Sequence, residues 1–199
     1  MVGGTMRPVE DLGWADETAV IVPVPAADQV VGRYRRRLDH SAAWGVPAHV
    51  TVLYPFVPPH LVDALGVVEV LGGLVEEVEA FECAFRRTAW FGEDVLWLAP
   101  EPASPFRRLT EAVWGRFPEC PPYGGAVAEA VPHLTVGSTP VGDVAALRDA
   151  ERELAGALPF RAEIGQVRLI AGGDRPDSWR TVAEWDLRPR RVHSPSEVE

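Results

Sequence analysis

The sequence has few cysteines and little positive charge, and each shortage limits what the protein can be. Among its 199 residues only Cys83 and Cys120 are cysteines, too few for a disulfide framework or a Cys-x-x-Cys site, which favours a reducing compartment. The net charge of −10 argues against tight, sequence-independent binding along nucleic acid, because such binding depends on neutralising phosphates. A small nucleotide or the end of an RNA is still compatible, since one local site can be positive within an acidic protein.

Long apolar runs are also missing. No run reaches the roughly 20 residues of a membrane-spanning helix, and residues 1–16 lack the basic-then-apolar order of a signal peptide. We therefore expect a cytoplasmic protein with no membrane partner. With 47% hydrophobic residues, the chain is long enough to bury a sizeable core as one compact domain or two small lobes.

Two stretches carry the same pattern, a histidine and a threonine two residues apart within an apolar, β-branched run. One stretch contains His49 and Thr51, and the other contains His133 and Thr135. Residues i and i+2 of a strand point to the same face with Cα atoms about 6.5–7 Å apart, so each stretch places an imidazole beside a hydroxyl. A single pair would be weak evidence, but two such matches arise by composition alone in only about 2% of such chains. The repeat therefore predicts two His-x-Thr pairs that face one phosphate.

Hydrophobic periodicity predicts alternating strands and helices around these motifs. Besides the two His-x-Thr strands, strands are expected at residues 18–24, 81–90, 95–99, 160–164, 167–171 and 179–187, and helices at 26–38, 60–79, 104–117 and 143–157. Glycines 66, 72 and 73 are the points at which the second helical region could break. A similar order of strand, helix, strand and hairpin partner occupies residues 48–99 and 132–187. We expect each half to form a small sheet that needs the other half to cover its open face.

The expected fold class is therefore α+β. It is a bilobal, pseudo-twofold duplicated fold in which two mainly antiparallel sheets flank a central cleft, with helices on the outside and one His-x-Thr pair on each wall. A lead-in at residues 1–17 precedes this single domain of interleaved lobes at 18–188, and a flexible tail follows at 189–199. The Pro- and Gly-rich loop at residues 118–131 precedes the second motif, and loops of this length often act as functional lids.

Two histidines and two threonines permit phosphodiester chemistry without a metal. Imidazole has a pKa near 6.5, so at neutral pH one copy can act as a base while its twin acts as an acid. One histidine would take a proton from the attacking water or hydroxyl, and the other would give a proton to the departing oxygen. The threonine hydroxyls would donate to the non-bridging oxygens and stabilise the charge that develops there.

These motifs resemble those of the 2H phosphoesterase superfamily, which includes the 2′-5′ RNA ligases and the RNA 2′,3′-cyclic phosphodiesterases. The similarity covers about residues 18–187, and the loop Pro121-Pro122-Tyr123-Gly124-Gly125 also resembles bacterial members. The resemblance implies a bilobal fold with both histidines in a central cleft. It also implies metal-independent action on cyclic phosphates of nucleotides or RNA ends, with the threonines as phosphate binders.

Other side chains have less specific assignments. Four aromatic residues are candidate substrate contacts, with plain core or rim packing open for each: Tyr54, Trp97, Tyr123 and Trp179. The arginines at positions 33, 35, 36 and 37 of the first helix are interpreted as a solvated helix face. The remaining histidines lie in no recognisable metal-ligand spacing, so we expect no metal site and no cofactor: His40, His60 and His193.

The resulting hypothesis is a monomeric phosphodiesterase that acts on a 2′,3′-cyclic phosphate, or on a 2′-5′ phosphodiester, of an RNA 3′ end or a small nucleotide. His49 and His133 form the acid/base pair, and Thr51 and Thr135 bind the phosphate. A module that binds nucleotides or RNA ends with little catalysis is the alternative, and a hydrolase that uses the histidines as metal ligands is a third interpretation. The near-symmetry of the motifs leaves open which histidine is the acid and which is the base.

Overall fold

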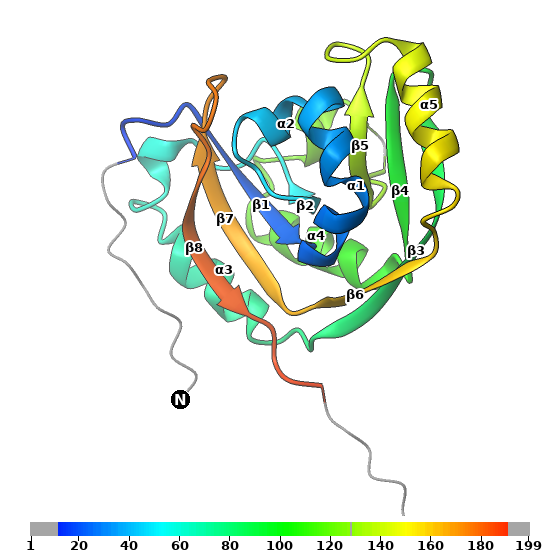
Figure 1. Ribbon diagram of the computed structural model, residues 1–199. Helices are drawn as coiled ribbons and strands as arrows, with labels where there is room; N and C mark the ends of the chain where they lie inside the picture. The colour runs from blue at the N-terminus through cyan, green and yellow to red at the C-terminus, as the bar shows by residue number, and fades with distance from the viewer. Residues whose placement is uncertain (1–11, 128, 191–199) are drawn as a thin grey trace, which may run out of the picture.

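The computed structural model describes residues 12–127 and 129–190, and its scaffold is a pair of four-stranded antiparallel sheets (Figure 1). The first sheet has the order β2-β1-β7-β8, with strands His49–Leu53, Glu17–Pro23, Gln166–Gly172 and Arg180–Asp186. The second has the order β5-β4-β3-β6, with strands Leu134–Ser138, Val95–Glu101, Phe81–Phe91 and Phe160–Ile164. The expected α+β class with two antiparallel sheets is confirmed.

Helices connect most of these strands. They are α1 (Pro25–Leu38), α2 (His40–Ala43), α3 (Val67–Val75), α4 (Ser104–Arg116) and α5 (Val144–Leu154), with 3₁₀ turns η1 (Pro59–Leu61) and η2 (Pro122–Gly125). The helical region expected at 60–79 is divided, because Gly66 adopts the left-handed conformation with φ 56° directly before α3. Gly72 instead lies inside α3, where a Cβ would come within 3.0 Å of the Trp185 indole nitrogen on β8.

The two halves of the chain exchange strands between the sheets. The first His-x-Thr strand, β2, lies in one sheet with β7 and β8 from the second half, whereas β5 lies with β3 and β4 from the first half. The expectation of one small sheet per half is therefore wrong. Helices cross over as well, since α1 packs against β5 and β6 of the second sheet and α4 packs against β2 of the first. One cluster of buried apolar side chains accordingly includes residues from both sheets.

The strand exchange leaves β2 and β5 at one edge of each sheet, and these two edge strands contact each other. Their side chains alternate as the sequence predicts. Val50, Val52, Leu134 and Val136 are buried in the core, while the motif residues between them are half-buried. The fold therefore brings both motifs to the junction between the sheets.

Candidate active site

The two histidine rings are held in the same way by the backbone. His49 begins β2, and its Nδ1 lies 2.8 Å from the carbonyl oxygen of Pro47. His133 immediately precedes β5, and its Nδ1 lies 2.8 Å from the carbonyl oxygen of Val131. A carbonyl can only accept a hydrogen bond, so each Nδ1–H donates and each neutral ring keeps the lone pair on Nε2. Nε2 is therefore the atom of each ring that can take up or release a proton.

Burial disfavours a positive charge on either ring. The pKa of His49 is lowered to about 4, chiefly by burial and next by the Arg35 guanidinium, while the Pro47 carbonyl and Asp39 oppose the change. The pKa of His133 is also lowered, chiefly by burial, with the Val131 carbonyl opposing. A charge on His133 is the smallest of the contributions to the lowered pKa of His49, so the two rings interact electrostatically.

Tyr123 lies between the two motifs and contacts residues from both sides. Its backbone N–H donates to the Tyr54 carbonyl over 2.7 Å, its hydroxyl interacts with the Thr51 side chain, and its ring stacks on His133 with centroids 6.2 Å apart. Tyr123 also adopts a left-handed conformation with φ 52°, which costs a non-glycine residue about 1–2 kcal/mol. Strained backbone of this kind concentrates at functional sites. The contacts of Tyr123 with Thr51 and His133 place this candidate residue against both motifs.

A cavity lies beside each motif. The one next to His133 and Thr135 has a volume of about 430 Å³ and is walled by Phe91, Tyr123 and Val131. The one next to His49 and Thr51 has a volume of about 260 Å³, and its walls include Trp44, Tyr54, Trp179 and Ser41. A larger cavity of about 500 Å³ between α3 and α4 is more polar and lies away from both histidines, so we do not regard it as the reaction site.

The other three aromatic candidates occupy different positions. Tyr54 and Trp179 line the cavity beside His49, where their rings meet edge to face at 6.4 Å, and the Tyr54 hydroxyl donates to Glu17 over 2.7 Å. Trp97 is 8% exposed and packs against Phe91 and His133, with ring centroids 4.8 Å and 5.9 Å away. It is Phe91 that forms the wall of the cavity there. Trp97 therefore packs against the His133 ring without lining this cavity.

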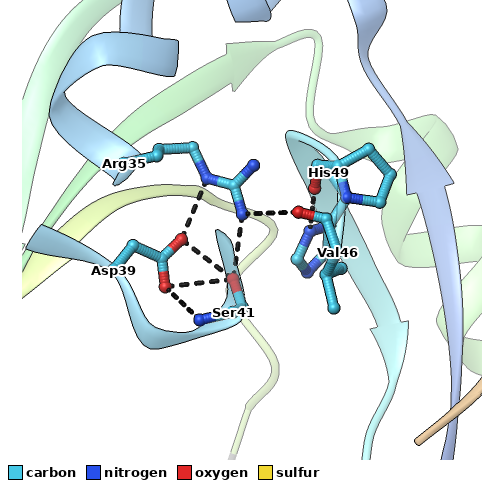
Figure 2. A network of polar contacts seen from close by, with 6 residues as sticks. Arg35, Asp39, Ser41, Val46 and His49 are labelled. Atoms are coloured by element: carbon cyan, nitrogen blue, oxygen red, sulfur yellow. Dashed lines mark hydrogen bonds and ion pairs between the residues drawn. The ribbon is translucent and has the colours of Figure 1, made fainter. Parts of the chain in front are cut away.

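Arg35 corrects the interpretation of α1 as carrying a solvated basic face. Arg33, Arg36 and Arg37 are exposed, but Arg35 is only 3% exposed and forms a 2.9 Å ion pair with Asp39. Its guanidinium also donates to the Ser41 hydroxyl and to the Val46 carbonyl (Figure 2). The only sequence signal for this contact was the i, i+4 spacing of an arginine and an aspartate, which is common on exposed helices as well.

Among the described residues, the remaining histidines are His40 and His60, which have different surroundings. His40 stacks on Trp44 with centroids 5.6 Å apart, and His60 is an exposed residue of η1. His193 lies outside the described residues. Across residues 12–127 and 129–190, no three His, Cys, Asp or Glu side chains gather in a way that could hold a metal ion.

The fold and the site together define a class of protein: paired His-x-Thr strands at the junction of two antiparallel sheets, as in the 2H phosphoesterase superfamily. The chain belongs to the 2′-5′ RNA ligase superfamily, whose sequence model matches residues 22–175. Membership in this superfamily supports a phosphoesterase enzyme with phosphodiesterase-type activity.

Solved structures agree with this assignment at the level of the fold. TT0787 of Thermus thermophilus superposes with a TM-score of 0.59 and 16% identity, over 88% of this chain and 100% of that chain. Apo LigT of E. coli superposes with a TM-score of 0.58 and 14% identity, over 88% and 99% of the two chains. LigT in complex with 3′-AMP gives a TM-score of 0.56 at 14% identity, over 87% and 99%.

One further comparison and one property of the helices are negative. No curated protein sequence matches the chain closely enough to count as a relative. Among the helices of the described residues, none combines the length and the apolar character needed to cross a membrane.

Proposed function

We propose that the protein is a metal-independent phosphodiesterase that acts on 2′,3′-cyclic phosphates, or on 2′-5′ phosphodiesters, of nucleotides or RNA ends. The observation that carries this proposal is the duplicated histidine geometry. Both rings have Nδ1 tied to the carbonyl two residues earlier, both keep Nε2 for proton transfer, and each is followed two residues later by a threonine of the same strand face.

The reaction follows from these groups. The phosphate sits between the motifs, and the hydroxyls of Thr51 and Thr135 donate to its non-bridging oxygens. One histidine accepts a proton at Nε2 from water as the water oxygen bonds to phosphorus. The bond from phosphorus to a ribose oxygen breaks, and the other histidine protonates that oxygen. Each proton transfer of this kind contributes roughly 10²–10⁴-fold to the rate.

The lowered pKa values suit a site that becomes charged only with its substrate. Without substrate, burial keeps both rings neutral at pH 7. A phosphate anion within a few ångströms raises the pKa of a neighbouring imidazole, because an opposite charge favours the protonated form. Binding of the anion therefore charges one histidine, which is then ready to act as the acid.

The cavities support a nucleoside as the organic part of the substrate. Bases stack on aromatic side chains, and aromatic residues wall both cavities: Phe91 and Tyr123 on one side, and Trp44, Tyr54 and Trp179 on the other. LigT of E. coli has been crystallised with NADP+, ATP and 3′-AMP, and a small nucleotide is our proposed ligand here.

We propose that the protein acts as a monomer, because one chain supplies both histidines. We also propose a cytoplasmic location, because free cysteines suit a reducing compartment.

Incubation with 2′,3′-cyclic nucleotides in excess EDTA tests the proposal. We expect turnover to a single monophosphate isomer, separated by chromatography, and a loss of at least 100-fold in the His49→Ala and His133→Ala variants. A His60→Ala variant is the matched control, because that exposed histidine lies on η1. Turnover only after added zinc would contradict the metal-free mechanism, and stoichiometric nucleotide binding without product would favour a binding module.

A further inference from the structure

A further cavity adjoins the one beside His133. It has a volume of about 350 Å³ and lies between α4 and the segment that contains η2, and we call it the α4 cavity. Val127 and Glu129 line both the α4 cavity and the cavity beside His133, so the two cavities meet at these side chains. A ligand that occupies the cavity beside His133 can therefore extend into the α4 cavity.

One side of α4 forms a wall of the α4 cavity. Arg107, Glu111 and Trp114 follow one another at spacings of four and three residues, which places them on the same side of the helix, and all three line the cavity. Trp114 is 44% exposed, which makes it the most exposed tryptophan of the chain, whereas Trp97 and Trp179 are 8% exposed. The Trp114 ring therefore takes little part in the core and offers the cavity an open aromatic surface.

The opposite wall of the α4 cavity is held in place by its backbone. Pro121 and Pro122 line this wall, and the fixed φ of proline leaves the stretch little freedom to move. The next residue, Tyr123, donates a backbone hydrogen bond to the Tyr54 carbonyl over 2.7 Å. The α4 cavity is therefore largely preformed, so a flat ring that enters it and stacks on Trp114 has to order little of the protein.

The charged side chains of the α4 cavity favour a nucleobase over a second phosphate. Among the described residues that line the cavity, Glu111 and Glu129 are acidic and Arg107 is basic. A carboxylate only accepts hydrogen bonds, so it suits the exocyclic amino group of cytosine, adenine or guanine.

Arg107 lies where the two cavities meet. Its Nε is 3.7 Å from Oε1 of Glu129, which lines both cavities, and this distance is longer than a hydrogen bond. A phosphate that joins two nucleotides would cross this point and accept hydrogen bonds from the guanidinium. Glu129 has a side chain that is 73% exposed, so it can turn towards solvent when Arg107 binds that phosphate.

We propose that the α4 cavity is a second nucleobase subsite, in which Trp114 stacks on the base of the nucleotide that precedes the reactive 3′ end. This inference rests on the proposed phosphodiesterase function and narrows its substrate to an oligonucleotide end. The terminal nucleoside occupies the cavity beside His133, and the preceding base occupies the α4 cavity. Glu111 accepts a hydrogen bond from the amino group of that base, and Arg107 donates to the phosphate between the two nucleotides.

Steady-state kinetics with a one-base and a two-base substrate tests the subsite. We compare adenosine 2′,3′-cyclic phosphate with the dinucleotide CpA that ends in a 2′,3′-cyclic phosphate. Wild type should have a kcat/KM about 5-fold or more higher on the dinucleotide, and Trp114→Ala should lose this advantage while its kcat/KM on the mononucleotide stays within about two-fold of wild type. Trp14→Ala is the matched control, because Trp14 is 37% exposed and lines neither cavity. Equal wild-type values on the two substrates, or an equal loss on both in Trp114→Ala, would overturn the inference.

The role of Glu111 is tested by changing the preceding base. CpA and UpA have bases of the same size, but cytosine carries an amino group where uracil carries a carbonyl oxygen. We expect wild type to have a kcat/KM about 3- to 10-fold higher on the CpA substrate, and Glu111→Ala to remove this preference. Glu119→Ala, at an exposed position that does not line the α4 cavity, should keep it. A preference for UpA in wild type, or an unchanged preference in Glu111→Ala, would contradict the assignment of Glu111.

Calorimetric titration with 3′-AMP and with CpA 3′-phosphate tests the subsite without any turnover. The dinucleotide should bind wild type with a Kd about 5-fold or more lower than that of 3′-AMP, and the two should bind Trp114→Ala equally. Trp114 is exposed, so its replacement should leave the fold intact. If neither cyclic phosphate is turned over but the difference in Kd is present, the proposed phosphodiesterase function fails and the subsite stands. Turnover together with equal Kd values in wild type would contradict the subsite and leave the proposed function standing.

Discussion

At the scale of single residues, the site depends on contacts within three positions of the chain. Each histidine ring is anchored to the carbonyl two residues before it, and each threonine shares a strand face with the histidine two residues before it. Local geometry alone therefore aligns an imidazole with a hydroxyl, whatever the rest of the fold does. This explains why the sequence alone predicts these four residues as a candidate site.

The threonine hydroxyls offer a direct test of phosphate binding. Thr51→Val or Thr135→Val keeps the side-chain shape and removes one donor, so we expect kcat/KM to fall about 10- to 100-fold, as for the loss of one hydrogen bond to a charged group. Thr181→Val, at an exposed position of β8, should have kcat/KM within about two-fold of wild type, as is usual for an exposed substitution. Equal activity of Thr51→Val and Thr181→Val would argue against Thr51 as a phosphate donor. Steady-state kinetics with a cyclic nucleotide provides the measurement.

At the scale of elements, the close approach of α1 to β5 connects the two motifs. α1 carries Arg35 behind the first motif, and β5 carries Thr135 of the second. The contact is possible because Gly137 has no side chain: a Cβ there would lie 2.5 Å from Leu38 Cβ and 2.8 Å from Leu147 Cδ2. Leu38 ends α1, so this glycine sets how closely the helix can approach the second sheet.

A methyl group at Gly137 should therefore disturb both packing and the site. We expect Gly137→Ala to reduce the free energy of unfolding by about 1–3 kcal/mol, which is typical of overpacking, and to lower kcat. Gly73→Ala is the matched control, since a Cβ at that exposed helical position meets nothing within 4 Å and should stabilise α3 by about 0.5–1 kcal/mol. Urea denaturation measures both values. A Gly137→Ala variant as stable as wild type would show that α1 can shift away from β5 without loss.

At the scale of the whole molecule, two sheets, each built from strands of both halves of the chain, partly bury two histidines where they meet. The crossed packing of α1 and α4 fixes the sheets against each other, and the edge strands β2 and β5 come into contact as a result. Burial of the rings between the sheets is the main cause of their lowered pKa values. Folding and protonation are therefore linked.

The linkage predicts how stability depends on pH. A histidine with a pKa of about 4 in the folded protein and about 6.5 when unfolded contributes its full stability above pH 6.5 and loses it as the pH falls towards 4. For His49 this loss reaches about 3 kcal/mol at low pH. We expect urea denaturation of wild type to show a decline between about pH 6.5 and 4 that is clearly smaller in His49→Asn. Parallel declines in the two proteins would contradict the lowered pKa.

Much of the fold could be predicted from the sequence because its elements have clear local signals. Alternating strands such as β3 and β6, and the Asp143 cap of α5, lie within a few residues of their expected bounds. The buried state of Arg35 could not be predicted, because its i, i+4 partner Asp39 is equally compatible with an exposed helix. In the folded chain the pair is buried, and Arg35 also donates to Ser41 and to the Val46 carbonyl, a contact that no helix pattern indicates.

The sequence by itself determined the α+β class and the side-by-side placement of each His-x-Thr pair, and it predicts the four motif residues as the site, because these depend on the alternation of residues within the strands. Only the tertiary structure decided that the halves exchange strands, that β2 and β5 meet, and that Arg35 stands behind His49 and not behind His133. These features depend on contacts between segments far apart in the chain, and no local pattern specifies which partner a buried face will find.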